Sequence, residues 1–447
     1  MKRGVWFQIH WLLSVALGVA IAIVCVTGAA LSFRVEISEA LNKEVMFVEP
    51  SAEAPMAMNE LLEKLGASLN DSRINSITLY KDPSRSARVG VGAAGSANMR
   101  GRAQYVNPYT AEMLPSESLR GDEFFSLMIR WHRWLGDPSR SWGKQAVAIA
   151  TIALIVITIT GLVVYFPFMK RNFYSSLTID FKKKGRGFLY KLHSVFGVWT
   201  LIFVLLMSFT GLWWSYDWYR NGLYLLAGVE RPTMQRARPN AENQARDATR
   251  SNVASGASQT ETSGAINAAT QNARGANESG RDQESATRNI VRTSADYLAL
   301  SKAYDMFRSE TLDNYKSVTI SFPQPDVKLF NVNWTPPNPA HSRASNQLVL
   351  DVEKGEVVRR VQYDDRTLGE KFISGIFPLH SGDFFGVTGL ILYCVSSLAV
   401  ALFVITGYML YYERFVRERN KKRKKSRDGA NAGVAVATEA NPKNDVF

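Results

Sequence analysis

The stretch KLHSVFGVWTLIFVLLMSFTG, residues 191–211, places a histidine before an apolar run and closes that run with a Thr-Gly pair. A helix that crosses a bilayer needs roughly 20 predominantly apolar residues, and this run is long enough. Three further runs are equally long and apolar, at residues 9–33, 146–166 and 386–412. The sequence therefore predicts a mainly α membrane protein built on a four-helix transmembrane bundle that sits in the lipid bilayer.

The net charge of +13 is distributed around these predicted spans. Basic residues crowd the connection 167–192 and the tail 413–447, and Lys2 and Arg3 precede the first span. If the spans alternate in direction, all three basic clusters lie on one side, which the positive-inside rule assigns to the cytoplasm. We therefore expect both termini in the cytoplasm and the two long connections outside it. Nucleic acid is not an expected partner, because no aromatic interleaving accompanies the basic residues.

The two halves of the chain repeat one order of features: histidine, span with Thr-Gly, outer segment, histidine, span with Thr-Gly. The first histidine-to-glycine spacing is 18 residues in both halves, and the second is 29 residues in one half and 27 in the other. The pairs are His10–Gly28, His193–Gly211, His132–Gly161 and His380–Gly407. We interpret this repetition as a duplicated two-helix unit.

The outer segments also resemble each other. Each begins with an amphipathic helical pattern, at 55–69 and 294–307, and continues with short alternating apolar stretches that are typical of strands. One helix on a small antiparallel sheet is a reasonable α+β unit. We therefore predict two small outer α+β domains.

The connection between the third span and the second outer domain has a different composition. Residues 230–293 are rich in Asn, Ala, Ser, Gln and Arg and poor in large apolar residues, so we expect disorder there. In the first half we expect the first span with its cytoplasmic end at 1–33, the first outer domain at 34–128, and an outer histidine segment with the second span at 129–166. A basic cytoplasmic loop at 167–192 leads to the third span at 193–216 and to an outer segment with the disordered linker at 217–293. The second outer domain at 294–372, an outer histidine segment with the fourth span at 373–412, and a disordered basic cytoplasmic tail at 413–447 complete the order.

Four of the five histidines lie at predicted membrane boundaries, one for each span. His10 and His193 fall on the cytoplasmic side, and His132 and His380 on the outer side. Ionisable groups at membrane depth are costly and often functional. Two neutral imidazoles that face each other in a helix bundle are suited to the axial positions of haem iron. We predict two haems b per chain, because no CxxCH motif for covalent attachment is present.

The glycines of the Thr-Gly pairs fit this hypothesis. A helix rises roughly 27 Å over 18 residues, so Gly28 and Gly211 reach the level of the outer histidines. Gly161 and Gly407 reach the level of the cytoplasmic histidines in the same way. A glycine allows a flat macrocycle to lie against the backbone, although small residues also serve ordinary helix packing. An ordinary interfacial position is the alternative for each histidine.

Basic residues beside the histidines are candidate partners for haem propionates. They are Arg130, Arg133, Arg140 and Lys191. Contact with lipid headgroups is the competing interpretation of these four side chains. The fifth histidine, His341, is expected to be an exposed loop residue.

Other chemistries lack their residues. No nucleophile constellation, HExxH motif, nucleotide-binding glycine loop or flavin fingerprint occurs in the sequence. No catalytic residue is therefore identified apart from the haem ligands. Electrons would have to come from a separate cytoplasmic or membrane donor.

The motifs KLHSVFGVW with its trailing TG, WHRWLGD and PLHSGDFFG resemble the PepSY-associated transmembrane family. Outer segments that end in NPYTAEML and DVEKGEVV add to the resemblance, which covers nearly the whole chain apart from 230–293 and the basic tail. The resemblance implies PepSY-like outer domains and a haem-bearing ferric-siderophore reductase of the Gram-negative cytoplasmic membrane. His10, His132, His193 and His380 would then be the haem ligands. A ferric siderophore or another ferric chelate would be reduced on the periplasmic side to release Fe(II) for iron uptake.

Three alternatives remain open from the sequence. The chain could be a non-redox membrane protein whose outer domains bind a partner in protease regulation or signalling. It could be a metal permease, although its spans lack the acidic or Met-rich positions that such a protein would use. It could also be a haem electron carrier with a different periplasmic acceptor.

Overall fold

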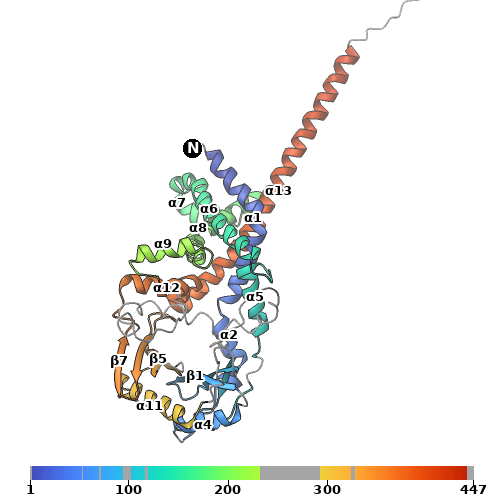
Figure 1. Cartoon of the computed structure of the whole chain (residues 1–447). Helices are drawn as coiled ribbons and strands as arrows, with labels where there is room; N and C mark the ends of the chain where they lie inside the picture. The colour runs from blue at the N-terminus through green and yellow to red at the C-terminus, as the bar shows by residue number, and fades with distance from the viewer. Residues whose placement is uncertain are drawn as a thin grey trace, which may run out of the picture.

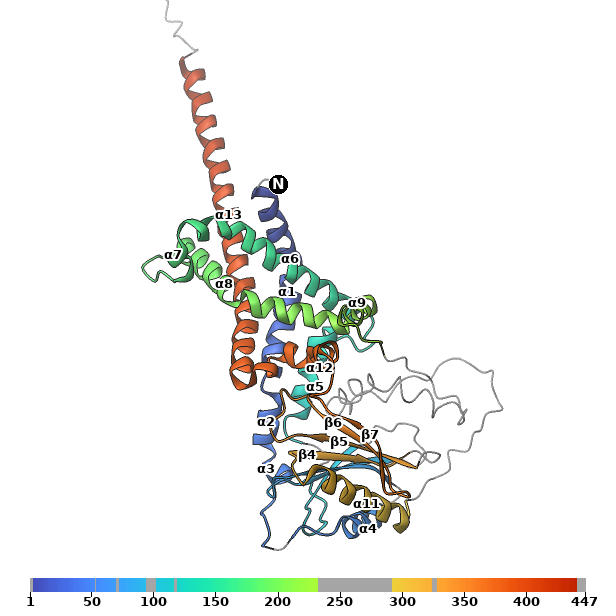
Figure 2. The same cartoon turned by 90° about the vertical axis from the view of Figure 1, so that its left-hand side faces the viewer.

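The computed structural model describes residues 3–52, 54–69, 72–93, 102–115, 119–231, 292–323 and 328–439. A helical bundle forms one end of the molecule and a β-sheet domain forms the other (Figures 1 and 2). The helices outside the sheet domain are α1 (Arg3–Leu31), α2 (Arg34–Leu41), α3 (Lys43–Met46), α5 (Asp122–Trp134), α6 (Trp142–Arg171), α7 (Phe173–Leu177), α8 (Gly185–Gly211), η1 (Leu212–Trp214), α9 (Asp217–Ala227), α12 (Leu368–Ser381), η3 (Asp383–Phe385) and α13 (Gly386–Glu439). The sheet domain contains α4 (Met58–Ser68), β1 (Ser72–Tyr80), β2 (Ala87–Ala93), β3 (Arg102–Val106), α11 (Ser294–Thr311), β4 (Ser317–Ser321), β5 (Leu329–Thr335), β6 (Asn346–Asp351) and β7 (Glu356–Val361).

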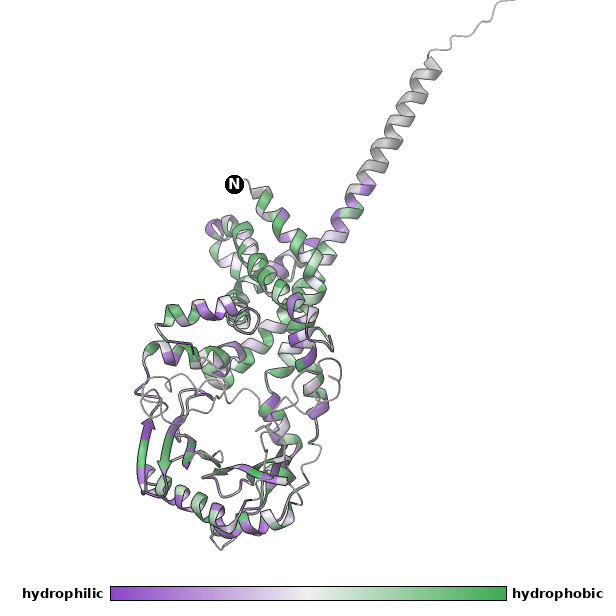
Figure 3. Cartoon of the chain, viewed as in Figure 1, coloured by the Kyte–Doolittle hydropathy of each residue, from purple (hydrophilic) through white to green (hydrophobic). Residues whose placement is uncertain are grey.

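Four of the described helices are long and apolar enough to cross a membrane, as the sequence predicts. They are α1, α6, α8 and α13, and much of their ribbon within the bundle is coloured green for hydrophobic residues in Figure 3. Each packs against two others, since α1 contacts α6 and α13, and α8 contacts the same two helices. One buried apolar residue from each span meets at the centre of the bundle. These residues are Ile21, Ala150, Val204 and Val400.

The outer segments form one antiparallel sheet of seven strands in the order β3-β2-β1-β4-β5-β6-β7. Strands β1 and β4, from different halves of the chain, pair at its centre with Ile77 opposite Ile320. The strands of each half then follow outward from this central pair. The arrangement is compatible with duplication of a unit, which stays a prediction.

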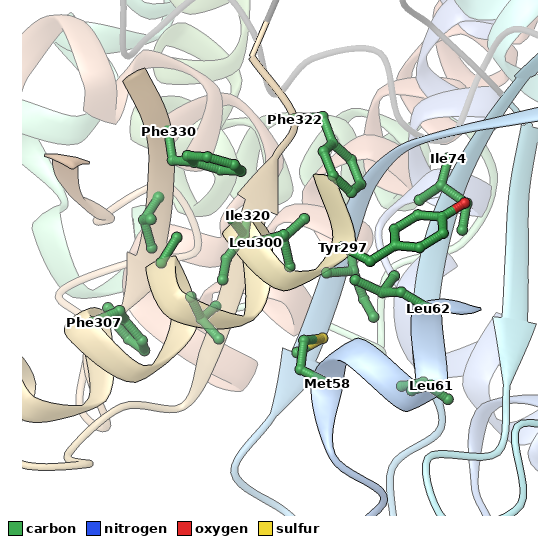
Figure 4. Packing of buried hydrophobic residues seen from close by; sticks show 14 of the residues in the cluster. Met58, Leu61, Leu62, Ile74, Tyr297, Leu300, Phe307, Ile320, Phe322 and Phe330 are labelled. Atoms are coloured by element: carbon green, nitrogen blue, oxygen red, sulfur yellow. The ribbon is translucent and has the colours of Figure 1, made fainter. Parts of the chain in front are cut away.

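Helices α4 and α11 cover the face of this sheet that points away from the bundle (Figures 1 and 2). Helix α4 buries Met58, Leu61, Leu62 and Leu65, at the spacing of one helix face. Both helices and the strands share a single apolar core, in which Tyr297 of α11 lies beside Leu62 (Figure 4).

The prediction of two separate domains, at 34–128 and 294–372, is therefore wrong. Both contribute to the same sheet and the same core. Three or four strands under one helix would leave an edge strand open and bury little apolar surface. Pairing β1 with β4 covers one edge strand of each half, leaves β3 and β7 as the edges of the joined sheet, and merges the two halves into one core.

The prediction of a disordered tail is also wrong over most of its length, because α13 continues from the fourth span to Glu439. The residues after the span are largely Arg, Lys, Glu and Ala, all good helix formers, and no proline interrupts them. The sequence also predicts disorder at 230–293, and residues 232–291 of this segment lie outside the described part of the chain.

Two histidine pairs as the candidate functional site

The structure brings the four boundary histidines together as two pairs. His10 of α1 and His193 of α8 form the tail-side pair, with ring centroids 6.3 Å apart. His132 of α5 and His380 of α12 form the sheet-side pair, with ring centroids 6.1 Å apart. Each pair joins the two halves of the chain, because one histidine comes from each half.

The Nδ1 atom of each histidine is held by a Thr-Gly segment of a neighbouring helix. In three of the four it donates to the backbone carbonyl three residues before the threonine. The distances are 2.9 Å from His10 to Ile157, 2.8 Å from His132 to Val24 and 3.0 Å from His380 to Met207. The fourth, His193 Nδ1, lies 2.9 Å from the Thr406 hydroxyl oxygen.

The threonine hydroxyls act as acceptors toward these imidazoles. Thr406 donates its own proton to the Leu402 carbonyl at 2.9 Å, so its oxygen is left to accept from His193. Thr27, Thr160 and Thr210 donate to the carbonyls of their own helices in the same way. Each imidazole is therefore protonated at Nδ1, and its Nε2 carries the lone pair that a metal requires.

The glycines of the same segments allow the imidazoles to approach the backbone. A Cβ atom at Gly28 would lie 3.0 Å from His132 Cε1, and one at Gly161 would lie 3.0 Å from His10 Cε1. At Gly211 the corresponding distance to His380 is 3.2 Å, whereas at Gly407 the distance to His193 is 4.0 Å. Three of the four glycines are thus required for close contact, and Gly407 is not.

This difference predicts unequal effects of alanine substitutions. We expect Gly28→Ala and Gly161→Ala to displace an imidazole by a few tenths of an ångström and to lower haem binding at that histidine pair. Gly407→Ala, with ordinary van der Waals room, should leave haem content unchanged. Haem-to-protein ratios of the three purified variants measure this, and equal ratios in all three would contradict the assignment of these glycines.

The separation of the rings fits a shared metal ion. A metal–imidazole bond is about 2.0 Å long and the ring nitrogen lies about 1.1 Å from its centroid, so two imidazoles on opposite sides of one ion have centroids about 6 Å apart. Among the described residues, no group of three or more His, Cys, Asp and Glu side chains could hold a metal. Two imidazoles with no third protein ligand fit an ion whose remaining ligands come from a macrocycle, as in haem.

The comparisons with known proteins agree with the architecture. The family model described as PepSY-associated TM region matches residues 7–414. The chain belongs to this family. The match includes all four spans and the four histidines of the two pairs, and it confirms the resemblance noted in the sequence. A search of curated proteins finds no match to this member of the PepSY-associated TM family.

Burial favours the neutral form of both sheet-side imidazoles. Burial lowers the pKa of His132, and burial with the nearby His132 ring lowers the pKa of His380 from 6.5 to about 4. A lowered histidine pKa contributes stability that is complete above pH 6.5 and is lost as the pH falls toward 4. Neutral imidazoles are the form that binds a metal.

We therefore expect haem loading at the sheet-side pair to stay constant as the pH falls below 6.5 and to decline only near the His380 pKa of about 4. Titration of haem-depleted protein with haemin at several pH values measures this. A loss of loading centred on pH 6.5 would show that these imidazoles titrate like exposed histidines.

The predicted propionate partners are placed differently from one another. Arg133 and Arg140 both lie over the Trp134 ring, each 4.8 Å from its centroid, and Arg130 is exposed on α5. Lys191 is buried and donates to the carbonyl of Ser175, which lies within α7 of this PepSY-associated TM chain. A buried ammonium must find acceptors, and this one finds them beside Ser175. The assignment of Lys191 as a propionate partner stays a prediction.

Several neighbours of the pairs were not identified from the sequence. Trp214 lies against His380 and Phe403 against His193, each with ring centroids 5.2 Å apart.

The expectation that His341 is exposed is wrong, because only 4% of it is accessible and its Nε2 lies 2.9 Å from the Tyr363 hydroxyl. His341 lies in the loop between β5 and β6, which folds inward against η3. The apolar pattern of the two strands predicts the strands but not the fold of this loop.

Proposed function

We propose that this chain is a di-haem electron-transfer protein of the membrane that reduces a ferric chelate, best a ferric siderophore, on the side of the sheet domain. One haem b would lie between His10 and His193, and the other between His132 and His380. The observation that carries the proposal is the pairing of four imidazoles at centroid distances of 6.3 and 6.1 Å, each with its Nδ1 atom hydrogen-bonded to a Thr-Gly segment. Haem bound there would supply one-electron redox chemistry.

The residues of the chain would perform four tasks for such a group. One histidine from each half of the chain would hold each haem, so the bound group would join the two halves. The carbonyls and threonines fix the ligating tautomer and orientation, as partners outside the ligand set do in other metal sites. The glycines Gly28, Gly161 and Gly211 let the rings approach the helices. The bundle excludes water from the region between the pairs, since all four spans contribute apolar side chains there.

The two sites would give electrons a route along the bundle. His10 and Thr27, which contacts His132, lie on the same helix α1, 17 residues apart. Such a helical segment is roughly 25 Å long, close to the thickness of the hydrocarbon core. The tail-side pair would therefore lie near one membrane surface and the sheet-side pair near the other.

The distribution of charge supports an orientation. The N-terminus and the basic end of α13 lie at one end of the bundle and the sheet domain at the other (Figures 1 and 2). The positive-inside rule would place the tail-side pair toward the cytoplasm and the sheet domain in the periplasm of a Gram-negative inner membrane. A cytoplasmic or membrane donor would then deliver electrons to the tail-side pair.

Reduction alone is sufficient to release iron from a chelate. Siderophores hold Fe(III) through hard oxygen donors, which bind the softer, less charged Fe(II) much more weakly. Each Fe(III) gains one electron and the donor loses one, so no bond of the chelator is cleaved. The enzyme would thus be a ferric-chelate reductase that serves iron transport.

The assay is reduction of a ferric siderophore by the protein in liposomes, with a chemical reductant enclosed and an Fe(II)-specific chelator outside. We expect Fe(II) to appear outside only when the protein is present and loaded with haem. If the reduced protein is re-oxidised by another periplasmic acceptor but not by ferric chelates, electron transfer would stand and the assignment of a ferric chelate as substrate would be wrong.

A further inference from the structure

A patch of exposed apolar side chains lies on the two helices next to the sheet-side pair. Helix α9 presents Trp218, Leu225 and Leu226, whose exposed fractions are 67%, 82% and 83%. Leu368 at the start of α12 is 86% exposed, and Phe372 one turn later is also exposed. Apolar surface of this extent on adjoining elements indicates an interaction site rather than scattered surface residues.

The position of this patch in the fold is at the end of a span. The third span ends at Trp214, and α9 begins at Asp217, only three residues later. Helix α12 packs against both α8 and α9, with Tyr224, Ile373 and Ile376 buried between them. Helices α9 and α12 run crosswise to α1 and α13 in Figure 1, so the helices that carry the patch join the bundle directly at the end of the third span.

Helix α9 is amphipathic in the sense that an interfacial helix requires. Its polar side carries Asp217, which pairs with Arg220 and Arg231. The apolar residues Trp218, Leu225 and Leu226 are at i, i+7 and i+8, which places them on one face. Helices with this division lie in the plane of the membrane, with the apolar face among the acyl chains and the polar face among the headgroups.

The two helices also enclose a groove that is open and apolar. Its volume is about 360 Å³, and its lining residues are Leu223, Leu226, Ala227, Leu368, Gly369 and Phe372. Gly369 brings the helices together, because a Cβ atom there would lie 1.9 Å from the Ala227 carbonyl oxygen. None of the described residues that line this groove has an ionisable side chain, so its chemistry matches a hydrocarbon chain.

We propose that α9 and α12 form a lipid-binding foot, defined by Trp218, Leu225, Leu226, Leu368 and Phe372, which inserts into the outer part of the leaflet next to the third span. The continuity of this face with the spans favours lipid over other occupants. The connecting sequence 232–291 contains no Leu, Phe, Trp or Tyr, so it is poorly suited to cover five large apolar side chains. The foot would also fix the depth of α12, which carries His380 at its other end. The lipid contact itself does not depend on the proposed haem function.

The experiment uses the full-length chain with Cys25 and Cys394 replaced by alanine, reconstituted in vesicles of phosphatidylethanolamine and phosphatidylglycerol. A nitroxide label is attached at Leu225→Cys, and a matched label at Leu312→Cys. Leu312 is equally exposed at 87%, but it follows α11 on the sheet face that points away from the bundle. Collision of each label with molecular oxygen, which concentrates in lipid, and with a water-soluble nickel chelate is measured by electron paramagnetic resonance.

We expect the label at position 225 to collide several-fold more with oxygen and several-fold less with the nickel chelate than the label at position 312. Equal access of the chelate to both labels would overturn the proposal, because the foot would then lie in water. Protection of position 225 from both reagents would also overturn it, since protein rather than lipid would cover the face.

Discussion

We expect His193→Ala to remove or disorder the proposed tail-side haem and to stop electron flow through the bundle, while the fold and the proposed sheet-side haem persist. This expected result follows from the geometry, because His193 and His10 face each other at 6.3 Å and no other described histidine lies in that pair. Loss of one axial imidazole leaves an ion with an open position, which eliminates its low-spin spectrum. Purified variants would therefore show the low-spin signal of one haem per chain instead of two, and no reduction of an outer acceptor by an inner donor.

Further variants make this prediction specific to the pairing. His10→Ala and the double variant His10→Ala/His193→Ala should resemble His193→Ala, since all three disrupt one site. His132→Ala or His380→Ala should remove the other haem instead. His341→Gln is the matched control, because this histidine is buried against Tyr363 and belongs to neither pair. An unchanged haem content and spectrum in His193→Ala would contradict the assignment.

The second large effect is expected from Thr406→Val. His193 Nδ1 has only the Thr406 hydroxyl as a hydrogen-bond partner within the described part of the chain. Removing this acceptor leaves a buried N–H without a partner and frees the tautomer, and such outer partners typically contribute about 10- to 100-fold in metal affinity. We expect weaker haem binding at the tail-side pair by that factor. We also expect a more positive reduction potential, because the imidazole loses basicity.

Thr160→Val is the matched control for this prediction. Thr160 is buried like Thr406, and valine has nearly the same shape as threonine. His10 Nδ1 nevertheless keeps its bond of 2.9 Å to the Ile157 carbonyl when the hydroxyl is lost. The tail-side haem of Thr160→Val should therefore change much less than that of Thr406→Val. Equal effects of the two substitutions on haem binding and potential would refute the proposed role of the hydroxyl.

The sequence was sufficient for the bundle and for the candidate residues. Apolar runs of membrane length define the spans directly, because the bilayer imposes a minimum length and forbids unpaired backbone groups. The histidines and the Thr-Gly pairs could be recognised because they recur at fixed spacing along the helices. Helical rise then placed each pair of glycines at the level of one pair of histidines, and the structure shows which partners meet, with Gly28 at His132 and Gly161 at His10.

The hydrogen bonds that orient the histidines could not be predicted in the same way. Three of the four Nδ1 atoms bind backbone carbonyls, and every residue type carries a carbonyl. The role of the threonine hydroxyls depends on the local donation of their protons to the helix, which only the structure shows.

Contacts between distant segments account for the incorrect predictions. Strands β1 and β4 pair although they are more than 200 residues apart in the chain. The alternation of apolar and polar residues in each strand is equally compatible with one large sheet and with two small sheets, so it does not identify the partner strand. The burial of His341 depends on η3 and Tyr363. Local sequence patterns do not identify such partners.

The measurement that tests the central claim most directly is the absorption spectrum of the detergent-purified protein, oxidised and then reduced with dithionite, with quantification of haem as its pyridine complex. Our account predicts two haems b per chain with the low-spin spectrum of iron that has two imidazole ligands. Protein purified after expression with ample haem, yet free of haem, would contradict the account. The histidine pairs would then be packing residues of the bundle, and the seven-stranded sheet would be the place to look for a binding partner.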